Sequence, residues 1–88
     1  PLPVAARLMD IQSEMGELVK EYLKGSDYGT SDFILHEDFK LELGDVLYST
    51  LSLACELNID AKEELIKVIN KYQARIDKKK TMGSEAED

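Results

Sequence analysis

Apolar residues recur at three- and four-residue steps along most of this 88-residue chain, and this spacing most constrains its fold. Between residues 4 and 24 the step is kept by Ala5, Leu8, Ile11, Met15, Leu18 and Tyr22. The same spacing returns in Leu65, Ile69, Tyr72 and Ile76. No segment alternates apolar and polar residues at every second position, as a half-buried strand would. The chain therefore predicts an all-α protein, an antiparallel helical bundle.

Polar stretches with glycine separate the predicted helices. Residues 25–31 hold two glycines with serine and aspartate, and we expect them to form a loop after a first helix over residues 4–24. A second helix is expected over roughly residues 36–57, with its start left open between Phe33 and Asp38 and with Ser31 or Asp32 as candidate N-caps. Two long helices joined by such a loop usually pack antiparallel.

The third helix has the clearest start signal. Asp60 followed three residues later by Glu63 is a capping-box pattern, and Asn58 is expected to end the preceding helix. The chain later becomes polar, with three consecutive lysines and an acidic end. We therefore expect one helical domain over residues 1–76 and a disordered polar tail over residues 77–88.

The predicted second helix is apolar on nearly every face after Asp45. Its apolar residues include Phe39, Leu41, Leu43, Val46, Leu47, Tyr48, Leu51, Leu53, Ala54, Cys55 and Leu57. Such a helix belongs inside something larger than three helices enclose, and a domain this small buries only about 60% of the surface of its unfolded chain. We expect oligomerisation to complete the core, with this helix packed against its copy. The alternative is that the short chain wraps the helix by itself.

The acidic balance argues against a nucleic-acid partner or an anionic membrane. The chain has 18 acidic and 11 basic residues, a net charge of −7 and a pI near 4.6. No stretch reaches the roughly 18 consecutive apolar residues of a membrane span. The single cysteine, Cys55, precludes an internal disulfide, and its apolar surroundings predict a buried thiol. We expect a cytoplasmic protein.

Two pairs of acids lie inside the apolar helices, Glu14 with Glu17 and Glu42 with Asp45. Residues three apart share a helix face, so antiparallel packing can bring all four carboxylates together. Two like charges about 4 Å apart repel by roughly 4 kcal/mol at an effective dielectric of about 20, so a dry cluster needs a cation. All-oxygen ligands predict Mg²⁺, with Mn²⁺ as a substitute.

Each acid pair also encloses a glycine, Gly16 or Gly44. A glycine inside a helix costs about 1 kcal/mol relative to alanine. Its repetition at the same offset suggests that helices approach closely there or that a ligand reaches the acids. The alternative for both acid pairs is an ordinary solvated helix face.

The pattern Glu-x-x-Glu, 24 intervening residues and Glu-x-x-Asp resembles the signature of the MazG nucleotide pyrophosphohydrolases. The resemblance covers about residues 8–75. It implies an Mg²⁺-dependent hydrolase that splits a nucleoside triphosphate between the α and β phosphates, releasing the monophosphate and pyrophosphate. It further implies a role in house-cleaning of nucleotide pools. It also implies a homo-oligomer, a dimer or a dimer of dimers.

The resemblance implies a set of site residues as well. The metal ligands would be Glu14, Glu17, Glu42 and Asp45, with Glu14 and Glu17 also taking part in catalysis. Ser13 departs from the family, which often has a further glutamate at this position. The general base is therefore left to one of the four acids or to metal-bound hydroxide.

A triphosphate needs positive charge beyond the metal. Lys71 and Arg75 lie four residues apart, hence on one helix face, with Asn70 beside them. The family similarly places basic residues in this helix, so we expect these three to bind the substrate. The alternative is that they are surface charges that complement the dipole near a helix C-terminus.

Two other functional classes compete with the enzyme. One is a non-catalytic helical interaction module whose acids bind a basic partner. The other is a di-iron carboxylate bundle, which is disfavoured because it requires Glu-x-x-His pairs that this chain lacks. His36 is the single histidine and makes a poor metal site by itself. Tyr48 is expected to pack in the core, with stacking on a base as the alternative.

Overall fold

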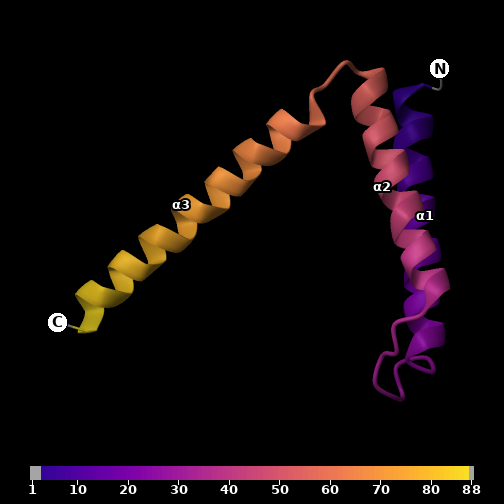
Figure 1. Ribbon diagram of the computed structural model, residues 1–88, viewed down its shortest axis with the longest axis horizontal. Coiled ribbons are helices and arrows are strands. Elements are labelled where there is room, and N and C mark those ends of the chain that lie inside the picture. Colours follow the sequence, from indigo (N-terminus) through magenta and orange to yellow (C-terminus); the bar gives the residue numbers. More distant parts are fainter. Residues whose placement is uncertain (1–2, 88) are drawn as a thin grey trace. The chain divides into compact units, whose positions relative to one another are not determined.

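The computed structural model describes residues 3–87, and side chains up to residue 81. Helices α1 (Val4–Gly25), α2 (Glu37–Glu56) and α3 (Ala61–Glu87) account for most of them, and no strand occurs in this part of the chain (Figure 1). The all-α prediction is confirmed, and both predicted N-terminal helices agree with α1 and α2 to within a residue at each end. The chain divides after Asn58 into two compact units, the α1–α2 hairpin and α3.

The two helices of the hairpin run antiparallel and side by side (Figure 1). Their less exposed positions are spaced three and four apart, as in a two-helix seam. In this seam α1 contributes Arg7, Ile11, Glu14, Leu18 and Glu21, and α2 contributes Phe39, Glu42, Val46, Ser49 and Leu53. Half of the seam positions are polar. The predicted apolar stripe of α1 therefore enters it only in part, because Leu8, Met15 and Tyr22 stay exposed.

Most large apolar side chains of the hairpin are exposed. Among the described residues Val46, 8% exposed, is the buried apolar side chain. Tyr48 is 72% exposed and Cys55 is exposed, so neither lies in a core that the single chain forms, where core packing and a buried thiol were expected. The reason is that α1 covers only one stripe of α2, while the apolar residues of α2 extend around the helix. Completion of the core by a second copy stays a prediction.

The loop between α1 and α2 folds back on the end of α1. The fully buried Ser26 accepts a hydrogen bond from the amide of Ser31 on its carbonyl oxygen, at 2.9 Å. Ser31 and Asp32 were candidate N-caps, but α2 begins only at Glu37, after the extended N-cap residue His36. The N-cap prediction was wrong because Ser31 belongs to a turn of the loop, in which its amide donates to Ser26.

Helix α3 starts where the capping pattern predicts. The amide of Glu63 donates a hydrogen bond to Oδ1 of Asp60 at 3.0 Å, which confirms Asp60 as the cap. The helix continues to Glu87, whereas a disordered tail was expected from residue 77. Lysine, methionine, alanine and glutamate are good helix formers, and no proline interrupts them. No helix in the described residues is long and apolar enough to cross a membrane.

Candidate metal centre

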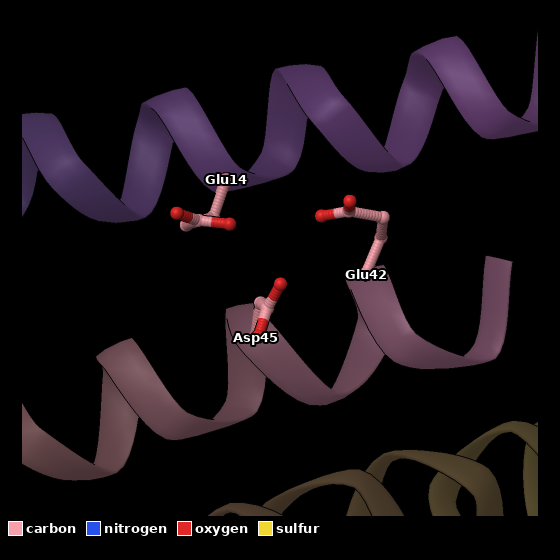
Figure 2. A group of neighbouring side chains, drawn as sticks. All are labelled: Glu14, Glu42 and Asp45. Carbon is pink, nitrogen blue, oxygen red and sulfur yellow. The ribbon is translucent and has the colours of Figure 1, made fainter. Parts of the chain in front are cut away.

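Three of the four predicted acids meet in the middle of the α1–α2 seam. Carboxylate oxygens of Glu14, Glu42 and Asp45 lie within 4.8 Å of one another. Figure 2 shows Glu14 reaching from one helix toward Glu42 and Asp45 on the other. We call these three residues the central layer. Glu14 and Glu42 are half-buried and Asp45 is exposed, so the layer is reachable from solvent.

The fourth acid, Glu17, does not join the central layer. Its carboxylate lies 3.8 Å from Nζ of Lys20, and its side chain is 52% exposed. Three residues advance a helix by about 300°, so Glu17 lies about 60° around α1 from Glu14. Only Glu14 of this pair therefore faces α2. A metal-ligand role for Glu17 stays a prediction.

Among the side chains that the structure describes, no basic group forms an ion pair with a carboxylate of the central layer. Partial burial raises the pKa of Glu14 above its ordinary value, and the charges of Asp45, Asp10 and Glu17 raise it further. Burial likewise raises the pKa of Glu42, followed by the charges of Asp45 and Glu14. A carboxylate with a raised pKa favours a proton or another cation. The oxygen-only donor set and this unbalanced charge fit a hard divalent ion such as Mg²⁺.

The two glycines beside the acids do not serve close helix packing within the chain. A Cβ atom added at Gly16 or Gly44 would have no heavy atom within 4 Å, apart from its own helix backbone and chain neighbours. Within the α1–α2 hairpin, close helix approach therefore does not explain the two glycines. Approach by a helix of a second copy and access of a ligand to the acids both stay predictions.

Toward the loop, the same seam contains a second titratable cluster, which the sequence reasoning missed. Oε2 of Glu21 lies 3.0 Å from Nε2 of His36, and Oε1 accepts a hydrogen bond from Nζ of Lys24 at 3.2 Å. We call these three residues the loop-end layer. The signal was present, since Glu21 follows Glu14 by seven residues and so returns to the same helix face.

At the opposite end of the seam, Arg7 joins the two helices. Its guanidinium donates to both carboxylate oxygens of Glu56, at 2.5 and 3.4 Å, and lies 3.7 Å from Asp10. Asp10 in turn accepts a hydrogen bond from the hydroxyl of Ser49 at 3.2 Å. The hydrogen bond from Arg7 lowers the pKa of Glu56, in contrast to the raised pKa of Glu14. The acids at both ends of the seam are thus paired with cations.

The predicted substrate-binding residues lie on α3. Lys71 and Arg75 both pack on the ring of Tyr72, with Nζ and Cζ at 5.3 and 5.5 Å from its centroid. The prediction that they share one helix face is confirmed. Asn70 is exposed beside them. A role of these residues in binding phosphate stays a prediction.

Comparisons with protein-family models, with curated proteins and with solved structures found no match to this chain. The site itself and the four-acid pattern are therefore the features that indicate function.

Proposed function

We propose that this protein is a Mg²⁺-dependent nucleoside triphosphate pyrophosphohydrolase. The observation that carries the proposal is the central layer, in which three carboxylates converge without a basic partner. The spacing of the four acids, similar to that of the MazG pyrophosphohydrolases, supports the choice of a triphosphate substrate. Deoxynucleotides are the expected substrates and removal of unwanted nucleotides the expected role.

Glu14, Glu42 and Asp45 would hold the cation. When bound, Mg²⁺ neutralises the triphosphate and lowers the pKa of coordinated water. The exposed side of the layer, marked by Asp45, would admit the phosphates, and the missing Cβ atoms of the two glycines leave room beside the acids. Water then attacks the α-phosphorus, and the bond from that atom to the α–β bridging oxygen breaks as pyrophosphate leaves.

Glu17 is the proposed acceptor of the proton from the attacking water. It lies one turn along α1 from Glu14, its carboxylate is solvent-accessible, and it is not needed among the three converging ligands. This assignment fills the position left open by Ser13. Lys71 and Arg75, with Asn70, are proposed to hold the phosphates.

The test is release of pyrophosphate from a panel of common and damaged nucleoside triphosphates with Mg²⁺. The expected result is release from at least one of them, with the monophosphate as the other product and no release in chelator. Absence of release across the whole panel would reject the enzyme.

Calorimetry with Mg²⁺ and Mn²⁺ separates the enzyme from an acidic interaction module. The module has no need of a tight cation site, whereas the central layer should bind either ion and lose binding in Glu14→Gln. The exposed apolar side chains of the hairpin are the observation that keeps the module as a second candidate.

A further inference from the structure

The loop-end layer is a polar cluster outside the central layer in which a histidine joins both helices and the loop. His36 contacts three segments that must come together for this end of the hairpin to close. It is the N-cap residue of α2, Nε2 lies 3.0 Å from Glu21 of α1, and Nδ1 lies 3.1 Å from the carbonyl oxygen of Ile34 in the loop. The carboxylate of Glu21 is 11% exposed, so it is largely shielded from water.

The contacts of the imidazole select its protonation state. A carbonyl oxygen only accepts hydrogen bonds, so the Ile34 contact requires a proton on Nδ1. An ionised carboxylate also only accepts, so the Glu21 contact requires a proton on Nε2. Both contacts are hydrogen bonds at once when both ring nitrogens carry protons, that is, when His36 is an imidazolium beside ionised Glu21.

We propose that His36 is a pH-sensitive clamp, which as an imidazolium ties α1, the loop and α2 together and on deprotonation releases the loop end of the hairpin. The proposal concerns a different cluster from the central layer and does not depend on the enzymatic activity.

The backbone around the clamp is tightly packed, so release has a defined structural consequence. The amide of Ile34 donates to the carbonyl of Gly25 at 3.0 Å, and a Cβ at Gly25 would lie 2.8 Å from the ring of Phe33. Phe33 also packs on Tyr22 and on Phe39, with ring centroids 5.4 and 5.0 Å apart. Loss of the hydrogen bond from His36 to the Ile34 carbonyl therefore frees this segment. The hydrogen bond from the Ile34 amide to the Gly25 carbonyl allows the change to be followed directly.

The charged groups that face His36 come from both helices. Glu21 and Lys24 belong to α1 and Asp38 to α2, while the loop contributes the Ile34 carbonyl. The positive end of the α2 dipole opposes a cation at the N-cap, and the acids of the first turn offset it. The hydrogen bond to Glu21 is the largest cause that raises the pKa of His36.

The direction of the pH effect follows from the two partners. His36 has a raised pKa, so its stabilisation is complete below its ordinary pKa of 6.5 and is lost as pH rises through the raised value. Glu21 has a lowered pKa, so its stabilisation is complete above 4.5 and is lost at lower pH. The clamp is therefore strongest between pH 4.5 and pH 6.5, and it opens as the pH rises through the raised pKa of His36.

NMR titration tests the protonation directly, because His36 gives the single histidine signal of the chain. We expect a pKa above 6.5 in the native chain and a fall toward 6.5 in Glu21→Gln. Glu37→Gln is the matched control, since this neighbouring carboxylate is 82% exposed and bonds to Lys40. A native pKa at or below 6.5, or an equal effect of both variants, overturns the proposal.

Amide hydrogen exchange tests the release. Protection of the Ile34 amide should fall as pH rises through the pKa of His36, about tenfold for each unit by which that pKa is raised. Leu57, whose amide bonds to Leu53 at the other end of the hairpin, should show no such step. In His36→Gln, which keeps a polar group without the charge, the step at Ile34 should vanish.

A step that persists in His36→Gln, or native protection at Ile34 that ignores the His36 titration, overturns the clamp. If a variant fails to fold, the two measurements on the native chain still decide the matter. The rise in the pKa of His36 and the change in protection of the Ile34 amide must agree in size, because proton binding and closure are reciprocally linked.

Discussion

The central layer and the loop-end layer place glutamates in the same seam with opposite consequences. Partial burial, followed by the charges of the neighbouring carboxylates, raises the pKa of Glu14. Glu21, seven residues further along the same face, has His36 and Lys24 as neighbours, and its pKa is lowered, chiefly by the hydrogen bond to His36. The two glutamates share the same helix and the same face, so their partners decide the direction of the pKa shift.

This difference distinguishes a structural acid from a candidate ligand. A carboxylate that already has cationic partners stabilises the hairpin and has little to gain from a metal ion. A group of carboxylates without such partners costs stability when ionised, and a divalent cation removes that cost. The central layer is therefore the part of the seam in which a bound cation increases stability most.

The largest expected effect is a difference in pyrophosphate release between substitutions of two glutamates of α2. Glu42→Gln removes one of the three converging carboxylates and should lower pyrophosphate release at least about 100-fold, since even the outer partners of metal ligands typically matter 10- to 100-fold. Glu37→Gln makes the same chemical change at an exposed site and should stay within about twofold. Turnover by both variants at native rates, measured at saturating Mg²⁺, would remove the central layer from the mechanism.

Two glycine substitutions sharpen the contrast between a closed loop end and an open centre. Gly25→Ala places a Cβ against Phe33 and the Ile34 carbonyl and should destabilise the protein by about 1–3 kcal/mol. Gly44→Ala meets no neighbour and should stabilise α2 by up to about 1 kcal/mol. Urea unfolding measures both. Destabilisation by Gly44→Ala would contradict an open centre, whereas a gain in stability with a loss of turnover would support ligand access there.

The smallest expected effect is a pH-dependent response to Mg²⁺. The raised pKa values of Glu14 and Glu42 mean that the folded chain gains stability as pH falls through them and loses it as pH rises. A cation needs the ionised acids, so Mg²⁺ should raise the thermal midpoint by a few degrees at pH 7 and by less at pH 5.

The matched measurement uses the double variant Glu14→Gln with Glu42→Gln and sodium chloride at equal ionic strength. The variant should lose both the pH dependence of the central layer and the response to Mg²⁺. A response that survives the double substitution, or that sodium reproduces, would point to screening of the net charge instead of a site.

Much of the local structure could be predicted because its causes are local. The apolar spacing gave α1 and α2 to within a residue at each end, and Asp60 marked the start of α3, as its bond to the Glu63 amide confirms. The acid spacing also anticipated the convergence of Glu14 with Glu42 and Asp45. Residues three or four apart share a face in any helix, so these conclusions do not depend on what the helix packs against.

The errors within α1 concern which face of the helix is buried. Leu8 and Met15 were expected in the core together with Ile11, yet only Ile11 lies in the seam. The apolar residues of α1 cover a face wider than one neighbouring helix can bury, and the seam follows a line of polar pairs at one edge of it. Glu17 was excluded from the central layer for the same reason, because it lies about 60° around the helix from Glu14.

The sequence by itself determined the three helices, the bounds of α1 and α2 to within a residue, the start of α3 and an arrangement of acids able to meet. Only the tertiary structure decided which carboxylates have cationic partners across the seam, because those partners are distant in the chain. His36 is 15 positions from Glu21, and Glu56 is 49 positions from Arg7. Their pairing depends on the rotation of each helix about its axis, which is set when the two helices pack and is not encoded in the spacing of either one.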